Sequence, residues 1–86
     1  MEIIMYGSHL CQDVIYAITK LKDKDVAIDY RNISADFGAL KEFMHYRETD
    51  PMFAPVKKDN SLGIPFMILP DGTKTFDFRD VLKKIK

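Results

Sequence analysis

The stretch EIIMYGSHLCQDV, residues 2–14, decides how the chain folds, because its hydrophobic period changes within a few residues. Its first part, Glu2–Tyr6, is a short apolar run closed by Gly7-Ser8, and its length suits a buried β-strand. From Cys11 onward, apolar side chains recur at helical spacing. The stretch therefore predicts a strand, a turn that contains glycine, and a helix whose N-terminus carries Cys11.

Strand and helix patterns continue to alternate along the rest of the chain. The predicted elements that follow the first strand are a helix from Cys11 that ends in the charged turn Lys22–Asp25, a strand at Val26–Ile33, a helix at Ala35–Arg47, a short helix at Met52–Lys58, strands at Ile64–Leu69 and Thr73–Phe76, and a last helix after Asp77.

Caps and breaks mark the ends of these helices. The Ser34 hydroxyl is expected to cap the second helix, and Pro51 ends it because proline clashes inside a helix. Asp77 is expected to cap the last helix, with Asp80 as a capping-box analogue.

The side chains expected to face the core are Val14, Ile15, Ile18 and Leu21 in the first helix, Phe37, Leu40 and Met44 in the second, and Tyr6, Phe66 and Met67 in the strands.

The order of elements predicts an α/β fold. The first two strands are joined through a helix, so they should be parallel with a right-handed crossover, whereas the last two form an antiparallel hairpin. The expected architecture is a four-stranded mixed sheet with helices on both faces, in the order β-α-β-α-β-β-α, with the short extra helix before the third strand. Residues 1–86 are expected to form a single domain.

Composition excludes several classes of function. The 86 residues hold 13 basic and 13 acidic side chains, and this balance lacks the basic field that nucleic-acid binding needs. No apolar stretch is long enough to span a membrane, so no membrane partner is expected. One cysteine and two histidines make an internal disulfide impossible and a metal site improbable. A cytoplasmic protein with a reduced thiol is the expectation.

The position of the thiol allows two interpretations. Free cysteine is about 3% ionised at pH 7, and a helix N-terminus stabilises the reactive thiolate through unpaired amides and the helix dipole. Cys11 would then be a nucleophile. Alternatively, Cys11 is a small buried apolar residue, as free cysteines often are.

Taken together, these segments resemble the glutaredoxin-like branch of the thioredoxin fold over essentially the whole chain. The residues that carry the resemblance are Ile4-Met5-Tyr6-Gly7-Ser8 leading into Cys11-Gln12-Asp13-Val14, then Gly63-Ile64-Pro65-Phe66, and then Asp71-Gly72 leading through Phe76-Asp77 to Asp80-Val81-Leu82.

The resemblance implies a glutathione site and a role for each matching residue. Cys11 matches the family's nucleophile, and Ile64-Pro65 matches the pair with a cis-proline that faces it and whose backbone binds glutathione. Ser8, Gln12, Asp77 and Phe78 occupy further positions that contact glutathione in the family. Glutathione would be a co-substrate, with no bound cofactor. The partners would be a small thiol and a disulfide-containing or glutathionylated protein, and the chain would be a monomer or weak dimer.

The sequence also departs from the family pattern. Val14 stands where many members have a resolving cysteine, so an internal disulfide cannot form and any redox cycle must use one thiol. Ser8 replaces a lysine that binds the glycyl carboxylate, and the carboxylate of Asp77 would repel that of the ligand. Three hypotheses stay open: a monothiol oxidoreductase, a binding module without turnover, and an iron–sulfur site shared by two Cys11 residues across a dimer.

Overall fold

The computed structural model describes residues 1–85. Its elements, in chain order, are β1 (Glu2–Gly7), α1 (Gln12–Leu21), β2 (Ala27–Asn32), α2 (Phe37–Thr49), a 3₁₀ turn (Pro51–Phe53), α3 (Ala54–Lys58), β3 (Phe66–Ile68), β4 (Lys74–Thr75) and α4 (Phe78–Lys84). This order confirms the predicted sequence of strands and helices, including the extra helix before the third strand.

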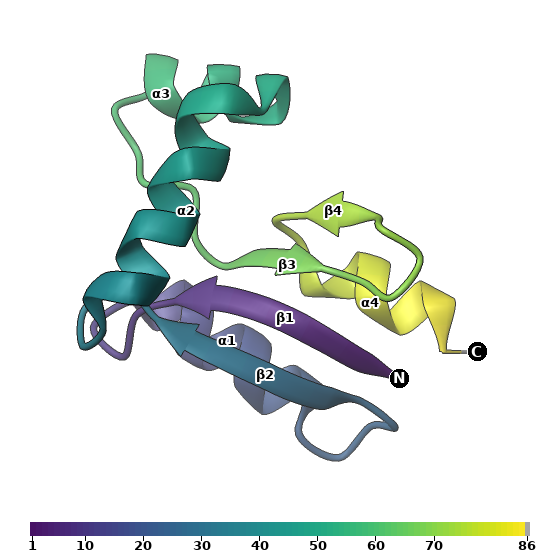
Figure 1. Cartoon of the computed structure of the whole chain (residues 1–86). Coiled ribbons are helices and arrows are strands. Elements are labelled where there is room, and N and C mark those ends of the chain that lie inside the picture. Colours follow the sequence, from purple (N-terminus) through teal and green to yellow (C-terminus); the bar gives the residue numbers. More distant parts are fainter. Residues whose placement is uncertain (86) are drawn as a thin grey trace.

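The four strands form one mixed sheet in the order β2-β1-β3-β4 (Figure 1). β1 and β2 are parallel, β3 is antiparallel to β1, and β4 is antiparallel to β3. At the centre, Met5 is paired with Tyr30 on one side and with Met67 on the other. The predicted parallel pair and terminal hairpin are therefore both confirmed.

Each face of the sheet has its own core. On one face, Ile3 and Met5 pack against Val14 and Leu21 of α1 and Val81 of α4. The opposite face, which α2 covers, holds an aromatic cluster made of Tyr6, Phe43, Phe53 and Phe66, all buried. Aromatic side chains bury about 150–250 Å² each, so this cluster supplies much of the hydrophobic stabilisation. The prediction that Tyr6, Phe66 and Met67 belong to the core is confirmed.

The predicted cap of α2 is wrong. Asp36, not Ser34, caps α2: its carboxylate accepts from the amides of Gly38 at 2.8 Å and Ala39 at 3.4 Å. The Ser34 hydroxyl instead lies 2.6 Å from that of Ser8.

At α4, Asp77 is the cap as predicted, but Asp80 does not complete a capping box. The carboxylate of Asp80 accepts from the Thr75 hydroxyl at 2.5 Å, and that hydroxyl accepts from the Asp77 amide at 3.0 Å. Thr75 therefore takes the place that the capping-box side chain would have.

Three predicted core positions lie outside the core. Phe37 is 81% exposed and Ile15 is 50% exposed, and Met44 is also exposed. Since α2 begins only at Phe37, its buried face is set by Ala39 and Phe43. This face is rotated from the predicted stripe by about one residue, or about 100° around the helix.

The strands are shorter than predicted at several ends. β3 covers Phe66–Ile68 rather than Ile64–Leu69, because Pro65 has no amide proton for a ladder and Leu69 bonds Thr73 in the turn. β2 lacks one residue at each end of its predicted span. No helix among residues 1–85 is long and apolar enough to cross a membrane.

Candidate active site around Cys11

Cys11 occupies the N-cap of α1, immediately after the turn that leaves β1. Its backbone is extended (φ −103°, ψ 121°), and its amide donates to the Ser8 carbonyl at 3.1 Å. Its carbonyl accepts the amide of Ile15 at 3.2 Å and so begins the helix. The Cys11 side chain makes no capping hydrogen bond, and the residue is partly exposed.

Cys11 lines a cleft of about 540 Å³. One wall is the Ser8–Asp13 turn and the other is the segment 61–64, which precedes β3. Leu10, 77% exposed, and Leu62, 52% exposed, are the large apolar side chains of the two walls. The cleft is thus an accessible hollow with apolar walls and one thiol.

A second hollow, of about 310 Å³, lies next to the first, because Ile64 and Asp13 line both. The Ile64-Pro65 peptide bond is cis, as the resemblance implied. The remaining wall comes from the start of α4, at Asp77, Phe78 and Arg79. The structure therefore brings together six of the predicted site residues: Ser8, Cys11, Ile64, Pro65, Asp77 and Phe78. Gln12, the seventh, does not line either hollow.

Asp77 and Arg79 form an ion pair at the start of α4. One oxygen of the Asp77 carboxylate accepts from the Arg79 amide at 2.9 Å, and the Arg79 guanidinium binds the same carboxylate through Nε and Nη2, at 3.0 and 2.8 Å. The Arg79 side chain lowers the pKa of Asp77, so that this carboxyl is ionised near neutrality. The Arg79 amide is therefore already occupied by the protein's own carboxylate.

Ser8 holds the turn in place and does not present its hydroxyl to a ligand. Its side chain is buried, is paired with Ser34 and accepts from the Leu10 amide at 3.1 Å. His9 is also engaged, since its Nδ1 lies 2.9 Å from Nδ2 of Asn32. Neither side chain replaces the lysine that is absent from this position.

Arg47 fixes the outer wall of the cleft, a role that its sequence position did not indicate. It donates from Nη2 to the Ser61 carbonyl at 2.7 Å and from Nε to the Leu62 carbonyl at 3.1 Å. The two bonds tie the segment 61–64 to the end of α2. No sequence signal identified Arg47, because a basic residue near a helix C-terminus is explained equally well by the helix dipole.

Gly63 is required in this wall, and its replacement gives a testable prediction. Its φ is +93°, and an added Cβ would lie 2.9 Å from the Phe53 ring. Gly63→Ala should therefore destabilise the fold through both backbone strain and overlap. Gly72→Ala is the matched control, because Gly72 has a φ of +88° but no atom within 4 Å of its added Cβ.

Urea unfolding of both variants separates the two contributions. Gly72→Ala should cost about 1–2 kcal/mol of unfolding free energy from backbone strain. Gly63→Ala should cost at least about 1 kcal/mol more, from overpacking against Phe53. Equal losses in the two variants would show that the Phe53 contact does not constrain this wall.

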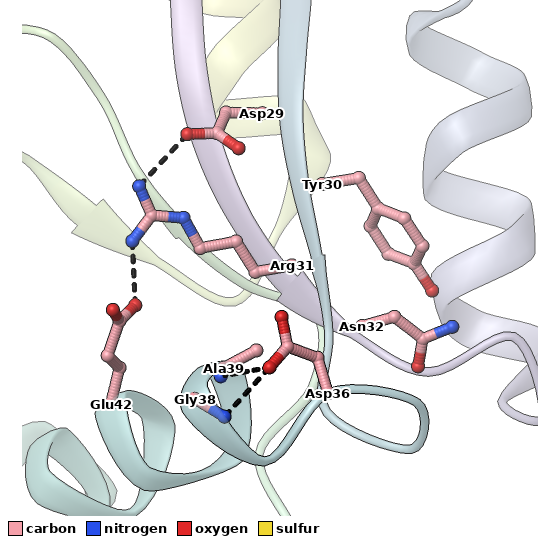
Figure 2. A pocket seen from close by; sticks show the side chains of 8 residues that line it. All are labelled: Asp29, Tyr30, Arg31, Asn32, Asp36, Gly38, Ala39 and Glu42. Carbon is pink, nitrogen blue, oxygen red and sulfur yellow. Dashed lines mark hydrogen bonds and ion pairs between the residues drawn. The ribbon is translucent and has the colours of Figure 1, made fainter.

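A third hollow, of about 510 Å³, lies between β2 and α2 and shares no lining residue with the Cys11 cleft. Figure 2 shows its ion pairs: Arg31 binds Asp29 at 2.9 Å and Glu42 at 2.6 Å. Its lining carries one cation, Arg31, against the carboxylates of Asp29, Asp36 and Glu42, and it contains no thiol, so this hollow is not the candidate reaction site.

Comparisons with known proteins define the class of fold. No protein-family model matches the sequence. The crystal structure of the glutaredoxin from Methanosarcina mazei Go1 superposes with a TM-score of 0.65 at 18% identity, over 98% of this chain and 77% of that one. The chain therefore has a thioredoxin-like α/β fold, as predicted. In sequence, it is 29% identical over 83 residues to an uncharacterized protein of Haemophilus influenzae, covering 96% of this chain and 92% of that protein.

Proposed function

We propose that this protein is a monothiol thiol-disulfide oxidoreductase that acts through Cys11 on mixed disulfides of glutathione or a similar small thiol. The observation that carries the proposal is the placement of the chain's single thiol. It lies at the N-cap of α1, partly exposed, and faces a cleft whose opposite wall contains Ile64. A helix N-terminus favours the thiolate, which is the nucleophile in disulfide exchange.

The reaction consists of two exchanges at one sulfur. In the first, the Cys11 thiolate attacks the glutathione sulfur of a mixed disulfide; a new disulfide forms between Cys11 and glutathione, and the substrate leaves as a thiolate that takes up a proton. In the second, a glutathione thiolate attacks the glutathione sulfur bound to Cys11. Oxidised glutathione leaves, and the electron pair returns to Cys11. The substrate thiol is thus released in reduced form, and one free glutathione is consumed, which leaves as oxidised glutathione together with the glutathione of the mixed disulfide.

The cleft supports this chemistry through its walls. The backbone of Ile64 would pair with the glutathione peptide in a strand-like manner. Leu10 and Leu62 offer apolar surface to a substrate chain that reaches the sulfur. Glutathionylated proteins are therefore the proposed substrates.

A second candidate function is a binding module without turnover, and one observation favours it. The Asp77–Arg79 pair occupies the α4 N-terminus, where the family binds a carboxylate of glutathione. Asp13 contributes a carboxylate to the walls of both hollows. If these charges exclude glutathione, the same cleft would hold a peptide without chemistry.

The two functions are separated by comparing wild type with Cys11→Ser. Wild-type protein incubated with oxidised glutathione should gain one glutathione, which peptide mass spectrometry should locate on Cys11. It should also reduce a glutathione mixed disulfide with turnover, whereas Cys11→Ser should do neither. Wild-type turnover in Cys11→Ser would refute the catalytic assignment. Absence of both glutathionylation and turnover in wild type would favour the binding module.

A further inference from the structure

The hydroxyl of Tyr30 is buried and unsatisfied. Figure 2 shows the Tyr30 side chain leaving β2 on the side opposite to Asp29 and Arg31. Among residues 1–85, its oxygen is the single buried side-chain oxygen or nitrogen without a hydrogen-bond partner. Native proteins rarely leave a buried hydroxyl unpaired, so such an atom calls for an explanation, and a role in catalysis is one that is known.

The Tyr30 ring lies beside the start of α1. A Cβ added to Gly7 would lie 3.2 Å from Cε1 of Tyr30 and 2.7 Å from Cγ1 of Val14. The ring is therefore next to both the end of β1 and the first turn of α1. Tyr30 and Cys11 also pack against the same core cluster. Burial, and secondly the negative charge of Cys11, raise the pKa of Tyr30, so the phenol keeps its proton at neutral pH.

We propose that Tyr30 is a positioning residue for Cys11, whose hydroxyl donates a hydrogen bond to the Cys11 sulfur when that sulfur is negatively charged. The inference rests on the proposed function, since both concern this sulfur. The hydrogen bond would act twice in the cycle. It would favour the thiolate before the first exchange and stabilise Cys11 as the leaving group in the second.

The other polar groups around Cys11 are already engaged or have the wrong charge. The Ser8 hydroxyl is bonded to Ser34 and to the Leu10 amide, and His9 is paired with Asn32. The carboxylate of Asp13, from α1, lines the cleft and opposes a thiolate. At the start of α4, Asp77 and Arg79 bind each other. Tyr30 therefore offers the donor hydrogen that these groups do not.

Tyr30→Phe tests the proposal because it removes only the hydroxyl. The rate of Cys11 alkylation by iodoacetamide, measured against pH, should show a midpoint about one unit higher than in wild type, which means about tenfold less thiolate below that midpoint. The thermal unfolding midpoint should stay the same or rise, since an unsatisfied buried hydroxyl has been removed. Tyr46→Phe is the matched control, because Tyr46 packs in the aromatic cluster on the other face of the sheet and should leave the alkylation profile unchanged.

The outcomes distinguish this proposal from the proposed function. An unchanged alkylation midpoint in Tyr30→Phe would overturn the role of Tyr30, even if wild type is glutathionylated and turns over. A lower unfolding temperature without a change in the alkylation midpoint would also overturn it, because the hydroxyl would then have a structural partner. If wild type is not glutathionylated but the midpoint still rises in Tyr30→Phe, the role of Tyr30 stands and the proposed function fails.

Discussion

Val14→Cys is expected to give the protein an internal dithiol reaction that the wild-type chain cannot perform. Val14 is fully buried beneath the first turn of α1, three residues after Cys11. Cysteine behaves as a small apolar residue, so it fits this position. After a protein disulfide is attacked by Cys11, the introduced thiolate would attack the Cys11 sulfur of the mixed disulfide, close an internal disulfide and release the second substrate thiol.

Geometry determines how readily that disulfide closes. Helical neighbours three residues apart have Cβ atoms about 5–6 Å apart, whereas a disulfide needs about 3.5–4.5 Å, so the first turn must tighten by about 1 Å. Cys11 is the N-cap, with extended backbone, and is therefore less constrained than a residue inside the helix.

Reduction of an intraprotein disulfide measures the gain. Wild type should show only the uncatalysed rate, and Val14→Cys should exceed it. Lys20→Cys is the matched control: it adds an exposed thiol to the same helix, too far along to bridge Cys11, and should not exceed that rate. A folded Val14→Cys chain that forms no internal disulfide on oxidation, judged by intact mass, would contradict the prediction.

Phe66→Ala is expected to cost about 3–5 kcal/mol of unfolding free energy, which is a large part of the stability of a small domain. Phe66 is fully buried in β3. Its ring centroid lies 4.9 Å from that of Phe53, 5.3 Å from that of Tyr46 and 6.0 Å from that of Tyr6. Truncation would leave a cavity in the centre of the aromatic cluster, because these rings cannot all move in to fill it.

Urea unfolding gives the test, with Phe37→Ala as the matched control. Phe37 is 81% exposed, so the same substitution there should change the unfolding free energy by less than about 0.5 kcal/mol. Similar losses in the two variants would mean that the aromatic cluster does not hold the α2 face on the sheet.

The hydrophobic periods of the sequence were enough to predict the order of strands and helices and the pairing of the sheet. They were not enough for helix ends, where both Ser34 and Asp36 are residue types that can cap α2. Asp36 is the cap because it lies directly before the first turn of α2, whereas the Ser34 hydroxyl is hydrogen-bonded to that of Ser8. That partner lies 26 residues earlier in the chain, and no local pattern can indicate it.

Two features of the candidate site were predictable. The strand-turn-helix pattern predicted Cys11 at the start of a helix, and the resemblance implied the cis bond between Ile64 and Pro65. The proposed role of Tyr30 and the hydrogen bonds of Arg47 were not predictable. The Tyr30 ring comes beside α1 only through the parallel register of β1 and β2, and alternation along β2 does not tell whether its hydroxyl has a partner. Arg47 meets the segment 61–64 through contacts between residues 14 or 15 positions apart.

The bonds from Arg47 bear on how the protein opens locally. The Ser61 amide donates to the Val56 carbonyl of α3, and the carbonyls of Ser61 and Leu62 accept hydrogen bonds from Arg47 of α2. This part of the wall is therefore bonded to α3 and α2 and not to the sheet. Elements that share such bonds open together in cooperative units. The wall facing Cys11 therefore belongs, in terms of native-state fluctuations, to the helical unit that follows β2. Motions that loosen α2 and α3 would widen the Cys11 cleft, while β1, the strand that leads to Cys11, keeps its hydrogen bonds in the sheet.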